Sequence, residues 1–152
     1  MNKVAILLGS ASDEKTMDGC CQYLSGFGIP YELKISSAHR QPDETVEFVR
    51  NAEKNGYSVI IAAAGMAAHL PGVCASHTVL PVIGVPLEGS ALNGVDALYS
   101  IVQMPAGVPV ATVAIGSAGA RNAAVLAAQI LALKDDAVRT KLVAFKKNGA
   151  KF

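Results

Sequence analysis

Residues 4–13 read VAILLGSASD, and this stretch determines the expected fold. The apolar run Val4–Leu8 ends at Gly9, a pattern typical of a strand buried on both faces of a parallel sheet. The next residues, Ser10–Asp13, include the types preferred at the start of a helix. A buried strand that leads directly into a helix predicts an α/β fold built from β-α-β units.

Four further segments have the character of strands. They are Tyr31–Ser36, Tyr57–Ala63, Pro81–Val85 and Pro109–Ile115. The last three are nearly continuous apolar runs, which indicates strands buried on both faces. In contrast, Tyr31–Ser36 alternates polar and apolar residues and is expected nearer an edge of the sheet.

Helical patterns lie between these strands. An apolar stripe with helical spacing runs over residues 17–27 and is closed by Gly26 and Gly28. The sequence QPDE at residues 41–44 begins a second helix, which Gly56 closes. The alternation predicts a single three-layer, flavodoxin-like α/β domain over residues 1–152, with a central parallel sheet.

The C-terminal quarter of the chain has two unlike helical segments. Ala123–Leu133 is apolar on every side apart from Gln129, so this helix must be covered twice. The tail from about 135 to 152 is amphipathic, with Val138 and Phe145 on one face. We expect this extended C-terminal helix to pack on a neighbouring subunit or on the apolar helix itself.

The composition is apolar for a domain of 152 residues. Hydrophobic residues make up 51% of the chain, charged residues 16%, and the mean hydropathy is +0.36. No apolar run approaches the roughly 18–20 residues that a bilayer span needs. We therefore expect a large subunit interface, rather than a membrane, to cover the excess apolar surface.

Charge and cysteine content argue against several classes of function. The net charge is +1, and there is no Trp to stack on bases, so nucleic acid is not expected as a partner. Cys20, Cys21 and Cys74 have no metal-binding spacing and are expected as small core residues. An odd number of cysteines without a disulfide framework fits a cytoplasmic protein.

Ligands of doubly wound sheets bind beyond the carboxyl ends of the strands, so the residues after each predicted strand are the candidates for a site. After the first strand, Gly9 allows a tight turn. Ser10, Ser12 and the N–H groups of the helix start can hold an anion, and Asp13 can accept hydrogen bonds from sugar hydroxyls. The same residue types are also ordinary helix caps.

The second strand is followed by Ser36-Ser37-Ala38-His39-Arg40. Arg40 carries a planar fork that suits phosphate, and His39 titrates near neutral pH. The alternative is a solvated loop with a salt-bridged arginine. The position one strand away from the Gly9–Asp13 loop favours a functional site.

The third strand is followed by AAGMAAHLPG at residues 63–72. These small residues let a ligand touch the backbone, and exposed N–H groups there can bind a carboxylate or carbon dioxide. From the pattern alone we expect His69 and His77 to be structural histidines within the core. The side chain of Met66 can either narrow the pocket for carbon dioxide or point into the core, and we expect it to point into the core.

The ends of the last two strands give weaker signals. Asp96 is expected to cap a helix or to be solvated. The segment 116–119, GSAG, lacks the lysine of a nucleotide-binding P-loop, and the chain has no GxSxG nucleophile elbow. These absences argue against a P-loop nucleotide site and an α/β-hydrolase.

Four ordered motifs together resemble one known family. They are GSASD at 9–13, SAHR at 37–40, AAHLPG at 67–72, and GVDALYSIVQMPAGVPVATVAIG at 94–116 followed by NAAVLAAQILAL. From about Val4 to Leu133 the chain resembles the class I 5-(carboxyamino)imidazole ribonucleotide mutases of purine biosynthesis. The related class II carboxylases, which take free carbon dioxide, carry SAHK, so Arg40 and AAHLPG indicate class I. Met66 stands where the family usually has a second glycine.

The resemblance implies an enzyme that isomerises N5-carboxyaminoimidazole ribonucleotide to 4-carboxy-5-aminoimidazole ribonucleotide without ATP, metal or organic cofactor. It implies that Ser10 and Arg40 hold the phosphate, that Asp13 holds the ribose hydroxyls, and that His39 is the catalytic acid and base. The other substrate-binding residues that it implies are Ser12, Ser37, Ala38, Gly65, Ala67, His69 and Leu70.

The resemblance also implies a homo-octamer, in which residues 103–105 lie near the site of a neighbouring subunit. Two alternatives remain on the same fold: a carboxylase that uses free carbon dioxide, and a non-catalytic module that binds a phosphorylated ligand. A receiver-like module would need an acidic pocket at the first strand and a lysine after the last. Here Asp13 stands beside a single acid, Glu14, and Gly116-Ser117 offers no lysine.

Overall fold

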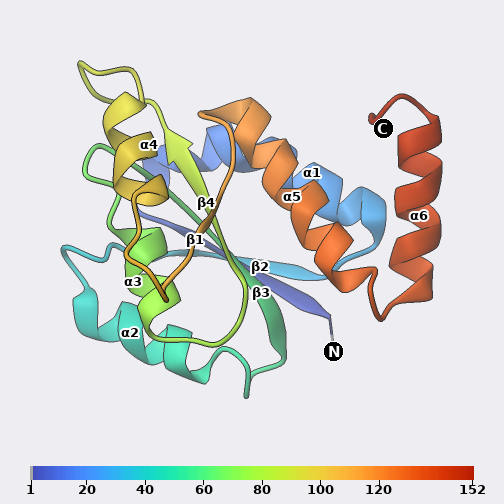
Figure 1. Cartoon of the computed structure of the whole chain (residues 1–152), viewed down its shortest axis with the longest axis horizontal. Helices are drawn as coiled ribbons and strands as arrows, with labels where there is room; N and C mark the ends of the chain where they lie inside the picture. The colour runs from blue at the N-terminus through green and yellow to red at the C-terminus, as the bar shows by residue number, and fades with distance from the viewer. Residues whose placement is uncertain (1) are drawn as a thin grey trace.

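The computed structural model of the chain describes residues 2–152 (Figure 1). Its five strands form one parallel sheet in the order β2-β1-β3-β4-β5. The strands are β1 (Lys3–Leu8), β2 (Tyr31–Ile35), β3 (Tyr57–Gly65), β4 (Val82–Leu87) and β5 (Ala111–Thr112). From β1 the chain moves to β2 on one side and then to β3 on the other. This reversal creates a switch point, the usual place for a ligand in such sheets.

Helices cover both faces of the sheet, as the alternation of strand and helix patterns predicted. Apart from the 3-10 turn η1 (Ala11–Asp13), they are α1 (Glu14–Phe27), α2 (Pro42–Asn51), α3 (Leu70–Ser76), α4 (Val95–Val102), α5 (Ser117–Leu131) and α6 (Asp136–Lys147). The helices α1 and α5 pack on one face, α2, α3 and α4 pack on the other, and α6 lies outside α1 and α5 (Figure 1). The predicted three-layer α/β fold is confirmed.

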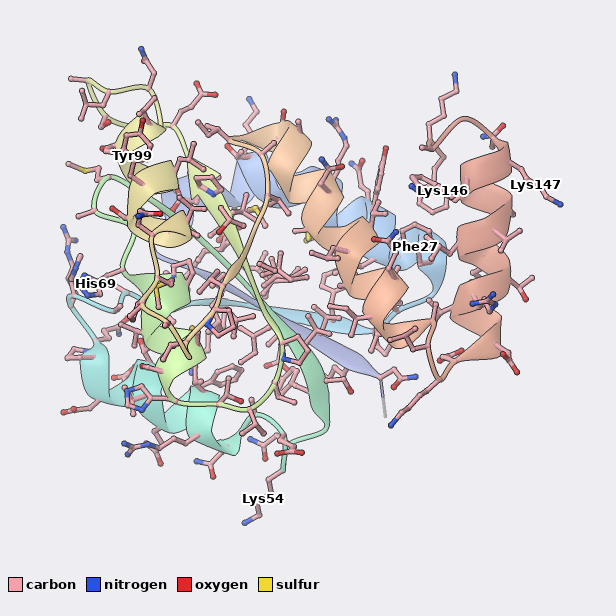
Figure 2. The ribbon with its side chains drawn as sticks, viewed as in Figure 1. Phe27, Lys54, His69, Tyr99, Lys146 and Lys147 are labelled. Carbon is pink, nitrogen blue, oxygen red and sulfur yellow. The ribbon has the colours of Figure 1, made fainter. Side chains whose placement is uncertain are left out.

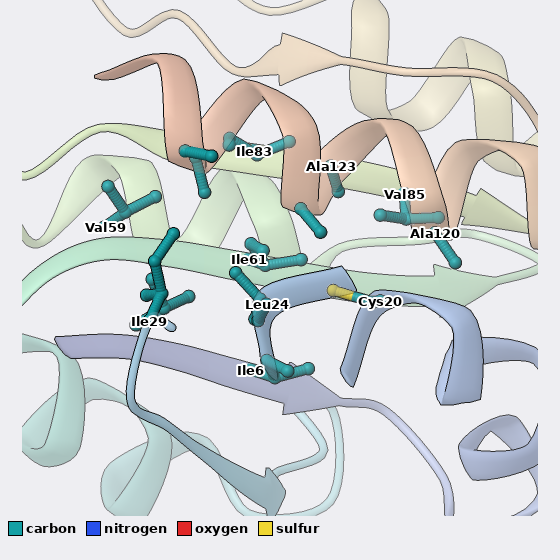
Figure 3. Packing of buried hydrophobic residues seen from close by; sticks show 14 of the residues in the cluster. Ile6, Cys20, Leu24, Ile29, Val59, Ile61, Ile83, Val85, Ala120 and Ala123 are labelled. Atoms are coloured by element: carbon teal, nitrogen blue, oxygen red, sulfur yellow. The ribbon is translucent and has the colours of Figure 1, made fainter. Parts of the chain in front are cut away.

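The central strand β3 explains why buried strands read as continuous apolar runs. Its residues Val59, Ile61 and Ala63 point toward α1 and α5, where they meet the side chains drawn in Figure 3. The alternate residues Ile60 and Ala62 point toward the other layer. From Val59 to Ala64 both faces of β3 are therefore buried, which explains the unbroken apolar run there.

The edge strands show two boundaries that the sequence patterns did not predict correctly. The segment expected as a strand over residues 109–115 pairs with β4 only at Ala111 and Thr112. Pro86 of β4 faces this edge, since its carbonyl accepts a hydrogen bond from the N–H of Gly116 at 2.9 Å, but Pro86 has no N–H to donate. The ladder therefore ends early. The prediction that β2 lies at an edge is confirmed.

The helix expected over residues 123–133 begins six residues earlier, at Ser117. Its N-cap is Gly116, whose φ of 78° is the left-handed conformation that favours glycine. The small residues of the first turn, read as a loop in the sequence, belong to the helix. They let it approach the segment after β5 closely: a Cβ on Gly119 would collide with the carbonyl oxygen of Ala114.

The helix α5 is covered from two sides within one chain, by the sheet with α1 and by α6. Phe145 of α6 is buried and meets the rings of Tyr23 and Phe27 edge-on, with centroids 5.6 and 5.1 Å apart. From the sequence, the C-terminal helix was expected to pack either on a neighbouring subunit or on the apolar helix of its own chain. The structure places α6 on α5 of the same chain, and packing on a neighbouring subunit remains a prediction.

Candidate functional site

The loop after β1 is held in shape by its own hydroxyls. Ser10 is the N-cap of the 3-10 turn: its Oγ accepts a hydrogen bond from the N–H of Ser12 at 3.4 Å and lies 3.0 Å from the Oγ of Ser12. Asp13 follows, half-buried, and burial raises the pKa of its carboxyl. The loop thus serves as a cap and also lines the cavity described below.

The loop after β2 is tied to the start of α2. The buried hydroxyl of Ser36 lies 2.7 Å from the Oγ1 of Thr45, which donates to the carbonyl of Gln41 at 2.8 Å. The N–H of Arg40 donates to the Oγ of Ser37 at 3.2 Å. These bonds set the direction in which the loop leaves the sheet and carry the His39 side chain toward the neighbouring strand end.

His39 and His69 form a pair across the carboxyl ends of β2 and β3. The Nε2 of His39 lies 3.3 Å from the Nδ1 of His69, and the two rings meet edge-on with centroids 5.2 Å apart. Two neutral imidazoles joined in this way need opposite roles, one nitrogen donating and the other accepting. A proton on either ring is therefore coupled to the tautomer of its neighbour.

The pattern-based expectation that His69 is a core histidine is wrong. Its side chain is exposed, because α3 begins at the next residue and the buried Leu70 takes the inward position. His77 is half-buried at the C-terminal cap of α3 rather than within the core. The implied role of His69 as a pocket residue fits the observed geometry, since His69 lines the cavity with His39.

Met66 does not point into the core, as the sequence analysis expected. Its side chain is 62% exposed, and its φ of 54° is left-handed. The chain turns sharply at the end of β3, where Gly65 passes close to the backbone of Leu87, and this turn directs the next side chain outward. A left-handed conformation costs a residue with a Cβ roughly 1–2 kcal/mol.

Glu88 directly follows β4 and brings a second carboxylate to the cavity. It lies beside two left-handed glycines that are the N-caps of helices: a Cβ on Gly94 of α4 would lie 3.5 Å from its Cγ, and one on Gly116 of α5 would lie 3.1 Å from its Oε1. Glu88 therefore lies beside the N-terminal ends of both helices.

The loops after β1, β2, β3 and β4 enclose one cavity of about 390 Å³. Predicted site residues that line it are Ser10, Ser12, Asp13, Ser37, Ala38, His39, Gly65, Ala67, His69 and Leu70. Arg40 is exposed beside His39 and is not among the lining residues. Its predicted phosphate contact would require the guanidinium to reach in from the rim.

The sequence reasoning missed several residues of this cavity. They are Thr16, Glu88 and Gly89, whereas Gly9, Ala64, Met66 and Ala68 lie in loops that the sequence indicated without being named as site residues. Glu88 was detectable, because the rule that ligands bind beyond strand ends applies to the fourth strand as it does to the first three. Thr16 lies one helical turn after Asp13, so helical spacing also pointed to it.

A second cavity of about 480 Å³ adjoins the first and shares Ala67, Ala68 and His69 with it. Met104 and Ser100 line its far side. Figure 2 shows His69 and Tyr99 at one end of the molecule and Lys146 of α6 at the other. The site is therefore remote from the C-terminal helix of its own chain.

This arrangement suits a small anionic ligand that undergoes proton transfer. Serine hydroxyls stand at one side of the cavity, the histidine pair at another, and the carboxylates of Asp13 and Glu88 can accept hydrogen bonds from hydroxyl or amine groups. Within residues 2–152 there is no cluster of three or more potential metal ligands. Over the same residues, no helix has the length and apolar character of a membrane span. Asp96 lies in the first turn of α4, outside this cavity.

Comparison with known proteins identifies the family. Residues 3–151 match the family model described as AIR carboxylase. The chain is 58% identical to the N5-carboxyaminoimidazole ribonucleotide mutase of Haemophilus influenzae over 96% of this chain and 89% of that protein, and 53% identical to the Escherichia coli enzyme of the same name over 95% and 86%. Its fold matches the crystal structure of Treponema denticola PurE with a TM-score of 0.87 and 28% identity, over 99% of this chain and 92% of that one. The resemblance inferred from the four motifs is confirmed: the chain belongs to the AIR carboxylase family.

Proposed function

We propose that this protein is an N5-carboxyaminoimidazole ribonucleotide mutase of purine biosynthesis. It isomerises its substrate to 4-carboxy-5-aminoimidazole ribonucleotide without ATP. Support comes from relatives of that name, which match nearly the whole chain at 53–58% identity. The structural observation that carries the proposal is the His39–His69 pair in a cavity otherwise lined by small residues, hydroxyls and two carboxylates.

The substrate lies across the switch point of the sheet. Its phosphate binds the hydroxyls of Ser10, Ser12 and Ser37, and Arg40 closes over it from the rim. Asp13 accepts hydrogen bonds from the ribose hydroxyls, which offset the desolvation that raises the pKa of its carboxyl. The aminoimidazole ring then extends toward the Gly65–Leu70 loop, whose small side chains leave room beside the backbone.

The chemistry requires two proton transfers at neighbouring atoms. When the carbamate loses carbon dioxide, the departing amine takes a proton from His39, and after C4 attacks the carbon dioxide the C4 proton returns to His39. A single group whose pKa lies near the working pH can serve both steps. His69, hydrogen-bonded to His39, fixes which nitrogen of His39 carries the proton.

The finer cellular properties follow from the same family. We propose a cytoplasmic homo-octamer. Several large apolar side chains near α4 support assembly, because they are between 43% and 63% exposed in a single chain; they are Leu92, Val95, Tyr99 and Val102. Contact there would bring a neighbouring chain close to the cavity that adjoins the site, which Met104 lines.

The direct test is turnover of purified N5-carboxyaminoimidazole ribonucleotide in the absence of ATP, followed by formation of the C4 carboxylate. A mutase converts the compound catalytically. A non-catalytic module that binds phosphorylated ligands would be protected against heat by the compound but would leave it unchanged. The second outcome would overturn the proposal.

A further inference from the structure

Met66 combines two unfavourable features at one position. It holds a left-handed backbone conformation that glycine adopts without strain, and it leaves a large apolar side chain 62% exposed. Folding alone favours glycine here, because glycine would remove both costs. The stability of the fold therefore gives no reason for a methionine at this position, and we look for the reason in what its side chain contacts.

The surroundings of Met66 indicate where its side chain acts. It lines the 390 Å³ cavity, in which the other apolar residues are alanines and the buried Leu70. It is the one large apolar side chain among these lining residues that is exposed. Met66 stands three positions before His69 on the loop after β3, and His69 pairs with His39 of the loop after β2.

We propose that Met66 covers the ring end of the substrate and retains carbon dioxide in the site between its loss from nitrogen and its addition to carbon. This inference rests on the proposed function and adds a residue specific to this chain. The thioether is flexible and polarisable, and such a group packs favourably against an aromatic ring such as aminoimidazole. Substrate binding then buries the side chain that the free protein exposes.

The reaction explains why a cover matters. The N5–carboxyl bond breaks and its electron pair stays on nitrogen, which takes a proton from His39. The carbon dioxide released is neutral and is held only by dispersion contacts and by the shape of the site. A pair of ring electrons then forms the bond from C4 to that carbon, and C4 returns a proton to His39. A gap above the ring during this interval lets carbon dioxide escape.

The test compares Met66→Gly with Met66→Leu. Glycine removes the cover and relieves the backbone, whereas leucine keeps the apolar bulk and the backbone strain. Unlabelled N5-carboxyaminoimidazole ribonucleotide is converted in buffer that contains ¹³C-bicarbonate and carbonic anhydrase. The ¹³C content of the C4 carboxylate then measures how often carbon dioxide exchanges with solvent during a turnover.

We expect Met66→Gly to raise ¹³C incorporation per turnover by about 5- to 10-fold, since the lost contact is of the size of one sulfur–aromatic interaction. Met66→Leu should retain most of the exclusion of label. The melting temperature of Met66→Gly should rise by about 2–4 °C as the strain is relieved.

Two results would overturn the inference while leaving the proposed function intact: equal label in the wild type and Met66→Gly, or a wild type whose product already exchanges completely. A wild type that forms no C4 carboxylate would contradict the proposed function, and this inference with it.

Discussion

His39 is the proposed catalytic acid and base, because it is the histidine that the loop after β2 brings into the cavity. We expect His39→Asn to lower turnover by about 10²–10⁴-fold, the usual contribution of a positioned acid or base, while the substrate still binds. Steady-state kinetics and calorimetric binding measure the two effects. The matched control is His77→Asn, since His77 lines neither cavity. Near-normal turnover of His39→Asn would show that His39 is not the catalytic acid and base.

Asp13 links binding to stability. Because burial raises its pKa in the folded protein, its contribution to stability is full below the unfolded pKa and is lost as the pH rises through the folded value. Asp13→Asn should therefore raise the free energy of unfolding at pH 7, by less than about 1 kcal/mol because the group is half-exposed. The difference should vanish near pH 3, where the wild-type carboxyl is protonated.

Denaturant unfolding of the two proteins at both pH values checks this prediction. The same variant should bind substrate more weakly, because the ribose loses a charged acceptor. A variant that is less stable than the wild type at pH 7 would show that the helix N-terminus beside Asp13 outweighs the cost of burial.

At the level of residues, the side chains that follow the strand ends and line the cavity, such as Ser10 and His39, were predictable from the sequence. It did not identify Met66 as a cavity residue, because hydrophobicity predicts burial and a left-handed turn overrides it. His69 was misread for a related reason: periodicity cannot reveal that the buried position belongs to the neighbouring Leu70. Such local reversals depend on backbone geometry that composition does not encode.

At the level of elements, the close approach of α5 to the segment between β5 and α5 limits substitution. A Cβ on Gly119 would collide with the backbone oxygen of Ala114, and backbone cannot move aside as a flexible side chain does. We expect Gly119→Ala to cost more than about 3 kcal/mol, the range of severe overpacking. Thermal unfolding of the purified protein measures the loss.

The control for this prediction lies in the middle of α1. A Cβ on Gly19 would lie 2.9 Å from the Cγ of Arg121, a side chain that can swing away. Gly19→Ala should be neutral or should stabilise by up to about 1 kcal/mol through helix propensity. If Gly119→Ala melted as high as Gly19→Ala, the packing described for α5 would be wrong.

The existence and type of the main helices and strands were predictable, because long apolar runs and helical stripes reflect burial directly. The boundaries were less so. The strand expected over 109–115 stops at Thr112, since Pro86 on the partner strand has no N–H to donate, and a single-strand pattern contains no information on its partner. The start of α5 was missed because glycine and serine in its first turn resemble a loop.

At the level of the whole molecule, the apolar composition predicted a subunit interface. In the structure, the residues that support this interface differ from those that the sequence indicated. The apolar helix α5 is largely covered by α1, the sheet and α6 of its own chain. Several exposed apolar side chains lie elsewhere, with Tyr99 63% and Val79 88% exposed, while Leu133, just after α5, is 80% exposed. We expect light scattering at micromolar concentration to report several subunits, with eight as the family expectation.

Tyr99→Glu places a charge in the expected interface near α4 and should lower the measured mass. A wild-type monomer at micromolar concentration would contradict the prediction of an interface. Lys54→Glu serves as the control, because Lys54 is exposed after α2 and lies far from Tyr99 (Figure 2).

The central claim is that the protein receives carbon dioxide already attached to its substrate. A bound carbamate is positioned before any gas forms, whereas a carboxylase must collect a small neutral molecule from solution. The decisive measurement is formation of the C4 carboxylate at low bicarbonate without ATP, started separately from N5-carboxyaminoimidazole ribonucleotide and from aminoimidazole ribonucleotide with carbon dioxide. We expect efficient conversion of the N5-carboxylated compound and poor use of aminoimidazole ribonucleotide with carbon dioxide. Efficient use of aminoimidazole ribonucleotide with carbon dioxide, with the N5-carboxylated compound inert, would contradict it and leave a carboxylase on the same fold.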